Sequence, residues 1–253
     1  MCYTTTQAGF ASIFNNFLFA YIYAKKLKKS LYVYDKNSPL GLNYSILKET
    51  FVKPSDIEYT TDANKEKIPS SRILSLLLTI PTDILQKHAK NLFQLTPSML
   101  SRIQTECSKY SFPTFDLGVH IRSGDKITTG EMSEIPIDYY VKEINTISRG
   151  NVFVMTDNIR LLTDLKEKIN EGIHLYSLDS QSPCQEGHDQ SVFNLSTDTV
   201  KMNAFIQFMT EIFYMQQIPK IICTFSSNIG RYLYLTNPTA TFKSLDMKLF
   251  IPM

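Results

Sequence analysis

The feature that most constrains the fold is an alternation of short apolar segments and helical patterns in the second half of the chain. The apolar segments have the length of buried strands and lie at residues 115–121, 151–155, 173–177 and 220–224. Apolar residues at helical spacing follow each of them, at residues 136–148, at 159–170, at about 198–217 and from Asn228 onward. This alternation predicts an open parallel sheet with helices on both faces, which belongs to the α/β class.

The first 35 residues repeat the same order of elements. Tyr3 to Thr6 is β-prone and leads into a turn at Gly9, and apolar residues then recur at helical spacing as far as Leu27. A short strand is expected at residues 31–34, so the chain opens as a parallel α/β unit. A helical stretch at about residues 70–110, broken at Pro81 and Pro97, separates the two halves. We therefore expect two Rossmann-like domains, residues 1–110 and residues 111–253.

The charge and hydropathy patterns exclude two classes of partner. The 26 basic and 24 acidic side chains nearly balance, whereas a general nucleic-acid binder carries a strong basic excess. The apolar stretch from Phe10 to Ala24 is interrupted by Asn15 and Asn16, is too short to span a bilayer and follows no basic segment. We expect a soluble, cytoplasmic protein without stable membrane insertion; a membrane anchor removed from the sequence is the alternative left open.

The four cysteines lie far apart and form no CxxC pair, which favours a reducing compartment over a disulfide framework. Cys184 and His188 have a loosely metal-like spacing. Two ligands are too few for a zinc site, so we expect no metal there.

Three polar clusters follow expected strands: residues 120–126, residues 156–158 and residues 226–228. Ligands of doubly wound sheets bind beyond the carboxyl ends of the strands, so these clusters are candidates for one site. The alternative for Asp157 or Asn158 is that either residue caps the helix that follows.

The first cluster places His120, Arg122, Asp125 and Lys126 directly after an apolar strand. Partial burial of so many ionisable groups costs several kcal/mol unless they pair with one another or bind a ligand. One interpretation is a structural knot of salt bridges. The other is an anion site, because the arginine fork suits a pyrophosphate.

The turn Ser226-Ser227-Asn228 supports the second interpretation. It opens a helix, and the free N–H groups at a helix start favour phosphate. Arg122 and this turn together suggest a nucleotide diphosphate leaving group.

Several nucleotide-binding motifs are missing from the chain. It contains no GxxxxGK[ST] loop and no GxGxxG, which argues against a P-loop kinase and an ordinary dinucleotide dehydrogenase. It also contains no Asp-x-Asp pair of the kind that holds a divalent metal on a sugar-nucleotide pyrophosphate. This favours a site in which arginine and backbone dipoles supply the positive charge, with no metal and no cofactor beyond the donor substrate.

At this point the motifs resemble those of a known family. Gly118-Val-His-Ile-Arg-Ser-Gly-Asp-Lys126 is similar to the first motif of the GDP-fucose-dependent fucosyltransferases, in particular the α1,6-fucosyltransferases and the rhizobial nodulation enzymes. The similarity continues through Glu131, Pro136-Ile137 and Tyr140. Val152-Phe-Val-Met-Thr-Asp-Asn158 resembles the second motif, and Cys223-Thr-Phe-Ser-Ser-Asn-Ile-Gly-Arg231 the third. Gly9-Phe10-Ala11 is similar to the glycine turn that opens the first domain.

The resemblance implies a GT-B fold, in which two Rossmann-like domains with parallel sheets face a central cleft. The N-terminal domain would lie on the acceptor side and the C-terminal domain would bind the GDP-sugar. His120 would hold the guanine or ribose side of GDP, and Arg122 would bind the β-phosphate. Glu131 resembles the general base, with Lys126 and Ser227 as a supporting relay.

Other positions carry over with differences. Glu211 stands where the family has an aspartate that reads guanine, and Asp157 and Asn158 match an acidic pair whose second member is amidated here. Ser123 replaces a second arginine, and Ala11 replaces a glycine. Donor chemistry therefore carries over better than acceptor choice.

The function that these observations favour is an inverting, metal-independent transfer of fucose from GDP-fucose to a hydroxyl of a glycan acceptor. Two alternatives are a GT-B transferase with another nucleotide sugar and a catalytically inactive GDP-sugar-binding protein.

Overall fold

The structure is a computed structural model, and it describes residues 1–35, 38–40, 44–62, 65, 67–68, 79–130, 132–178 and 187–247. Glu131 and Cys184, both singled out in the sequence, lie outside the described residues. The chain divides into two compact units between Arg102 and Ile103, somewhat earlier than the predicted boundary at residue 110.

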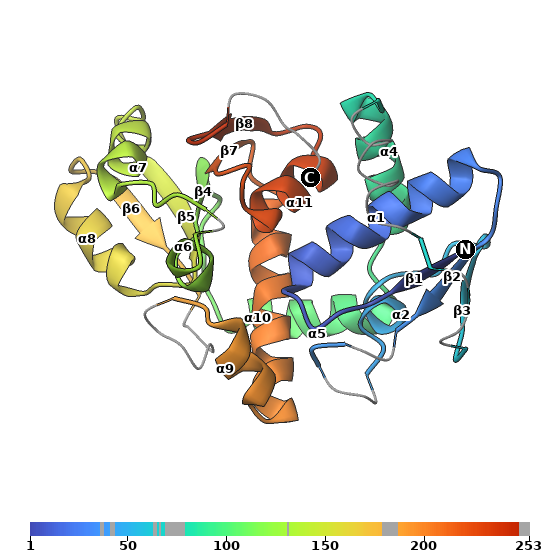
Figure 1. Cartoon of the computed structure of the whole chain (residues 1–253). Helices are drawn as coiled ribbons and strands as arrows, with labels where there is room; N and C mark the ends of the chain where they lie inside the picture. Colours follow the sequence, from blue (N-terminus) through green and yellow to red (C-terminus); the bar gives the residue numbers. More distant parts are fainter. Residues whose placement is uncertain are drawn as a thin grey trace. The chain divides into compact units, whose positions relative to one another are not determined.

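The first unit is built on a three-stranded parallel sheet in the order β1-β2-β3 (Figure 1). Its elements are β1 (Cys2–Thr4), α1 (Phe10–Lys26), β2 (Leu31–Tyr34), α2 (Ile46–Thr50), β3 (Ile57–Tyr59), α4 (Thr82–Leu92) and α5 (Pro97–Cys107), the last of which crosses the division. The predicted order of strand, helix and strand is confirmed, and β1 pairs with β2 through the register Tyr3 to Val33.

Helix α1 is the central core element of this unit. Its residues from Phe17 to Ala24 are all buried, and two lysines in its last turn suit the helix dipole. Phe14 packs edge-on against Phe51 at 4.9 Å between ring centroids, and Phe51 packs on Phe93 at the same distance. These aromatic contacts join α1 to the chain segments that follow α2 and α4.

The second unit contains a five-stranded parallel sheet in the order β6-β5-β4-β7-β8. Its elements are β4 (Leu117–Ile121), α6 (Asp125–Thr128), α7 (Ile137–Ile144), β5 (Gly150–Thr156), α8 (Arg160–Lys168), β6 (Ile173–Tyr176), α9 (Gln190–Leu195), α10 (Asp198–Met215), β7 (Lys220–Cys223), α11 (Asn228–Thr236) and β8 (Thr241–Ser244). The four strands predicted in this half are all present, and β8 is an addition at the sheet edge.

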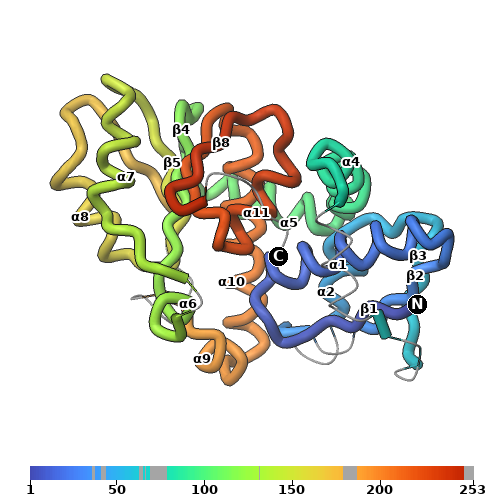
Figure 2. Tube along the Cα trace, turned by 45° about the horizontal axis from the view of Figure 1, so that its top comes forward, coloured from blue at the N-terminus to red at the C-terminus, as the bar shows by residue number. Residues whose placement is uncertain are grey.

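Helices α7 and α8 cover one face of this sheet (Figure 2). Alternate residues of β4, including Val119 and Ile121, point to that face and are buried with Ile144 of α7 and Leu165 of α8. The intervening residues of β4 therefore point to the opposite face, because strand side chains alternate.

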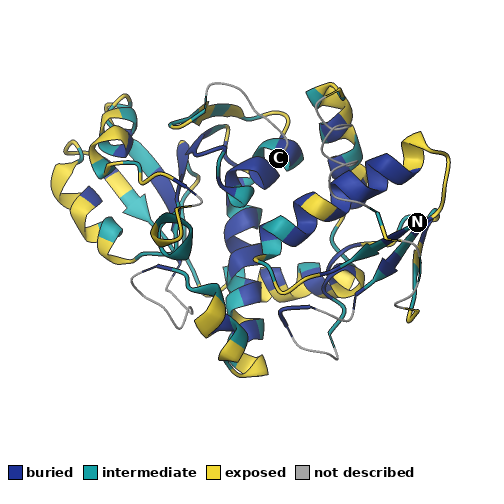
Figure 3. Ribbon diagram, in the orientation of Figure 1, coloured by how far each residue is buried: buried dark blue, intermediate teal, exposed yellow. Residues whose placement is uncertain are grey.

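Helix α10 covers the opposite face, and its buried residues are coloured dark blue in Figure 3. Gly118 lies so close to it that a Cβ there would stand 2.8 Å from the sulfur of Met215. Phe153 of β5 packs on Tyr214 of α10 with ring centroids 5.3 Å apart. His120, two residues after Gly118, thus points to the α10 side of the sheet.

The predicted α/β class with parallel sheets is confirmed for both units. Among the described residues, no helix is both long enough and apolar enough to cross a membrane.

Candidate active site

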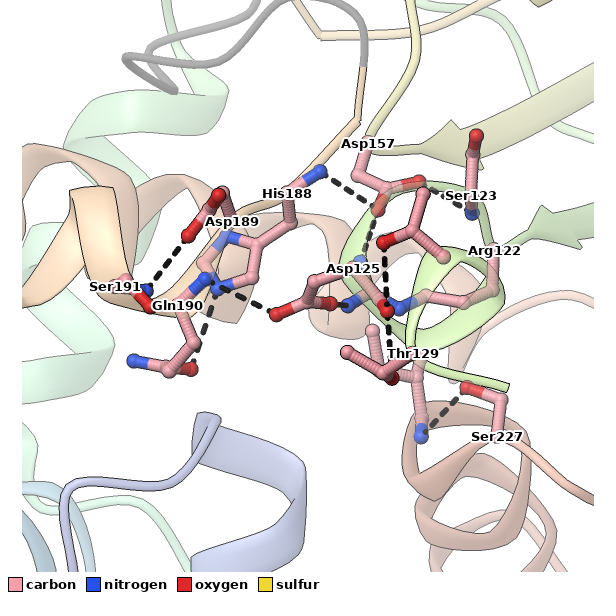
Figure 4. Close-up of polar contacts among 12 residues, drawn as sticks. Arg122, Ser123, Asp125, Thr129, Asp157, His188, Asp189, Gln190, Ser191 and Ser227 are labelled. Atoms are coloured by element: carbon pink, nitrogen blue, oxygen red, sulfur yellow. Dashed lines mark hydrogen bonds and ion pairs between the residues drawn. The ribbon is translucent and has the colours of Figure 1, made fainter. Parts of the chain in front are cut away.

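The centre of the site is the guanidinium of Arg122, which follows β4 and lies between two carboxylates (Figure 4). Its Nη2 donates to Oδ1 of Asp125 at 2.6 Å, and its Nη1 donates to Oδ2 of Asp157, which follows β5. The arginine side chain is 11% exposed, so both ion pairs are largely removed from water. The salt-bridge knot that the sequence offered as one interpretation is therefore present.

Backbone N–H groups donate further hydrogen bonds to the two carboxylates. Asp157 accepts from Ser123 N at 2.8 Å and from His188 N at 3.0 Å. Asp125 accepts from Gln190 N at 3.0 Å, and its own N–H donates to the His188 carbonyl at 2.9 Å. Residues 187–190 are thus joined to both acidic members of the cluster, which disperses their negative charge over several donors.

Two glycines allow this close approach. Gly124 has φ +74° and Gly187 has φ +129°, both conformations that side chains with a Cβ rarely adopt. A Cβ on Gly187 would lie 2.6 Å from Gly124 Cα, and one on Gly124 would collide with the backbone of His188. Neither position accepts another residue while residues 187–190 remain in place.

Two buried titratable groups lie on the α10 side of the sheet. Burial lowers the pKa of His120 to about 4, with the Asp157 charge opposing and the Arg122 charge reinforcing the shift. Burial raises the pKa of Glu211, on α10, to about 8; a hydrogen bond from Gln207 opposes this and the Asp157 charge adds to it. At neutral pH both groups are therefore mainly uncharged, and Nδ1 of His120 is buried without a hydrogen-bond partner among the described residues.

The turn between β7 and α11 is the predicted phosphate turn. Ser227 is buried, and its hydroxyl oxygen accepts from Ile229 N at 3.3 Å and caps α11. Ser226 instead faces Asp246: its N–H donates to Oδ2 at 3.1 Å, and its hydroxyl donates to the same oxygen. The two serines of the turn consequently have different partners.

The remaining predicted residues are placed as follows. Asn158 accepts from Arg160 N at 3.1 Å just before α8, whose N-cap residue is Ile159, and its amide also donates to Ser123 Oγ at 3.4 Å. Lys126 lies in α6. In the first unit, Gly9 precedes α1 with φ −59° and ψ 150°, which any residue adopts, and Phe10 and Ala11 begin that helix.

Tyr140 differs from its expected role in substrate binding. It lies on α7, is 1% exposed and packs in the apolar core with residues of β4, β5 and α8, so its ring is part of the scaffold and not of a ligand surface. Burial raises the pKa of its hydroxyl, and nearby Cys223, Asp246 and Asp157 add to the shift.

No family model and no curated protein matches this sequence. Several solved structures match its fold along nearly the whole chain. The fucosyltransferase NodZ from Bradyrhizobium matches with a TM-score of 0.59 and 11% identity over 97% of this chain and 95% of its own. A structure of NodZ α1,6-fucosyltransferase soaked with GDP-fucose matches with a TM-score of 0.58 and 12% identity, covering 94% and 92%. POFUT1 in complex with GDP matches with a TM-score of 0.57 and 9% identity, covering 98% of both chains.

The chain has the GT-B fold of these fucosyltransferases. This confirms the fold that the motifs predicted. The first and second motifs extend beyond the carboxyl ends of β4 and β5, and the third begins at the last residue of β7. These are three adjacent strands of one sheet.

Sequence reasoning missed Asp246, His188 and Gln190 as members of this site. Asp246 follows β8, and the rule that polar residues gather beyond strand ends would have found it had β8 been predicted. His188 and Gln190 contribute backbone N–H groups, which leave no signal in side-chain identity.

Proposed function

We propose that this chain transfers fucose from GDP-fucose to a hydroxyl of a glycan acceptor, with inversion at the sugar and without a metal ion. The observation that carries the proposal is the arginine held beyond β4 by Asp125 and Asp157, in a chain with the fold of GDP-fucose fucosyltransferases. The 111–253 part would bind the donor, and the 1–110 part would lie on the acceptor side.

Arg122 is the proposed ligand of the β-phosphate. A guanidinium has five N–H donors, and the ion pairs with Asp157 and Asp125 use one donor from each terminal nitrogen. The two aspartates fix the plane of the Arg122 guanidinium. Its remaining N–H donors can therefore bind a phosphate without a further loss of side-chain conformational entropy. As the bond between the sugar C1 and the phosphate oxygen breaks, its electron pair stays on the β-phosphate, and Arg122 stabilises that charge.

Glu131 is the proposed general base, on the strength of the motif resemblance. Its carboxylate would take the proton from the acceptor hydroxyl while that oxygen attacks C1 from the face opposite GDP. Lys126 and Ser227 are the proposed supporting relay. His120 and Glu211, on the α10 side of the sheet, are the proposed guanosine contacts, with Asp157 and Asn158 near the sugar and phosphate.

The test is GDP release from GDP-fucose by the purified chain, with and without a pool of glycan acceptors, in excess EDTA. We expect GDP release in EDTA, and GDP should raise the melting temperature because it binds the native state. Release from a different nucleotide sugar alone would replace the donor assignment. GDP binding without any turnover would favour an inactive binding protein, and activity that EDTA abolishes and manganese or magnesium restores would contradict the metal-free mechanism.

A further inference from the structure

The side chain of Asp246 continues the pairing of β7 and β8 beyond the point where the two strands end. Cys223 pairs with Ser244 in the register of these strands, and Leu245 N donates to the Cys223 carbonyl at 2.9 Å. The next donor on the β7 side, Phe225 N, meets Asp246 Oδ1 at 2.9 Å and Ser244 Oγ at 3.1 Å. A carboxylate thus takes the place of the next strand carbonyl.

The carboxylate of Asp246 also binds the following residue of the turn. Its Oδ2 accepts from both the N–H and the hydroxyl of Ser226, while its Oδ1 accepts from Ser244 Oγ at 2.7 Å and from Met247 N at 2.8 Å. Both oxygens are therefore well supplied with donors. Burial alone would raise the pKa of Asp246, but the hydrogen bonds from Ser226 and Ser244 outweigh it, so the pKa lies below its usual range.

Arg231 of α11 holds the same turn from its other side. Its Nε donates to the Phe225 carbonyl at 2.6 Å, and the side chain is buried. Phe225 is consequently fixed through both its N–H and its carbonyl. The backbone between β7 and α11 has little freedom while Asp246 stays in place.

This arrangement separates the roles of the two serines. The N–H and hydroxyl of Ser226 are committed to an internal anion, so they are not open to an anion of the donor. Ser227 accepts from Ile229 N through its hydroxyl oxygen, and its hydroxyl proton has no acceptor within the part of the chain that the structure describes.

We propose that Asp246 is a positioning residue for the donor diphosphate: it holds Phe225 and Ser226 so that Ser227, and not Ser226, meets the leaving phosphate. The proposal rests on the proposed function, since it concerns the same donor. An exchange of Asp246 for phosphate on the Ser226 donors is not favoured, because the carboxylate already has five donors and would have to be resolvated.

The experiment measures GDP affinity by calorimetry, together with kcat and KM for GDP-fucose, in Asp246→Ala, Asp246→Asn, Ser226→Ala, Ser227→Ala and the double variant of Asp246→Ala with Ser226→Ala. The matched control is Asp138→Ala, which removes an exposed carboxylate paired with Lys168 in the same unit. Thermal melting reports folding, and sodium formate serves as a replacement carboxylate.

We expect Asp246→Ala to weaken GDP binding by about tenfold, as for the loss of hydrogen bonds to a charged group, with Asp246→Asn between it and wild type. Formate should restore part of the affinity in Asp246→Ala but not in Asp138→Ala or wild type, which a merely structural defect would not show. Ser226→Ala should have a smaller effect that vanishes in the Asp246→Ala background, whereas Ser227→Ala should by itself weaken GDP binding.

Unchanged GDP affinity in folded Asp246→Ala would overturn the positioning role while leaving the proposed function intact. Tighter GDP binding would also overturn it, since Asp246 would then compete with the phosphate. If Asp246→Ala does not fold, the GDP affinity, kcat and KM of Asp246→Asn and Ser226→Ala test the positioning role instead. A wild-type chain that binds no GDP would overturn both proposals together.

Discussion

Nη2 of Arg122 lies 2.6 Å from Oδ1 of Asp125, three residues further along the chain. That short separation comes from the turn at Gly124, which has a positive φ and begins α6 at Asp125. The second carboxylate, Asp157, comes from a different strand and reaches the other terminal nitrogen. One aspartate is thus a local partner of the arginine, and the other joins the ends of β4 and β5.

Replacing Arg122 with Ala should reduce GDP affinity and turnover together, because it removes the proposed phosphate ligand. Arg122→Lys should recover only part of both, since lysine offers a point charge and cannot bridge two carboxylates as a fork. Calorimetry with GDP and a GDP-release assay measure the two effects. Arg149→Ala, at an exposed arginine of the same unit, is the control. Wild-type turnover in Arg122→Ala would show that the diphosphate is held elsewhere.

Asp157→Asn should destabilise the chain by about 1 to 3 kcal/mol, because a largely buried guanidinium loses one of its two charged partners. Asp125 remains as a partner, which keeps the loss below that of a fully orphaned charge. Urea unfolding of Asp157→Asn, Arg122→Met and the double variant gives the coupling free energy. Additive losses would mean that the Arg122 and Asp157 pair contributes nothing to folding.

The free energy of unfolding should fall with rising pH through Glu211. Its pKa is about 8 in the folded chain and about 4.5 when unfolded, so the native state holds a proton that the unfolded state releases. Stability from this group is full below about pH 4.5 and is lost as the pH rises toward 8. Glutamine cannot ionise. The free energy of unfolding of Glu211→Gln, relative to that of wild type, should therefore increase by about 2 to 4 kcal/mol between about pH 5 and pH 9.

Urea unfolding of both proteins across that pH range checks this, with Glu171→Gln as an exposed control in the same unit. A constant difference between wild type and Glu211→Gln at all pH values would mean that the pKa of Glu211 is the same in the folded and unfolded chain.

Glu131→Gln should lower turnover by about a hundredfold to ten-thousandfold while GDP affinity stays within about threefold of wild type. The amide keeps the shape and reach of the side chain but does not accept the acceptor's proton. Both quantities are measured on one preparation, with folding checked by thermal melting. Glu134→Gln, three residues away and exposed, is the matched control.

A fall in turnover of less than about tenfold would move the role of base to another group, with Asp157 as the next candidate. A collapse of GDP affinity in Glu131→Gln would instead make this residue part of donor binding.

Periodicity alone predicted most of the second unit. The strand expected at residues 220–224 and the helix from Asn228 correspond to β7 (Lys220–Cys223) and α11, because buried parallel strands and amphipathic helices leave strong, regular patterns. The edge strand β8 was missed, since Thr241–Ser244 is half exposed and lacks an apolar run. Strand β3, Ile57–Tyr59, was missed because three residues carry too little pattern.

The sequence by itself determined the α/β class, the succession of strands and helices along the chain, and the three motifs at the carboxyl ends of strands. These follow from local properties: the repeat of apolar residues, the turn residues and the residue types that suit a diphosphate. Tertiary structure decided the partners within the site. It paired Arg122 with Asp157, placed Tyr140 in the core and made Asp246 the hydrogen-bond acceptor of Ser226. Each of these contacts depends on which strands lie side by side in the sheet. That order is a non-local property of the packed sheet.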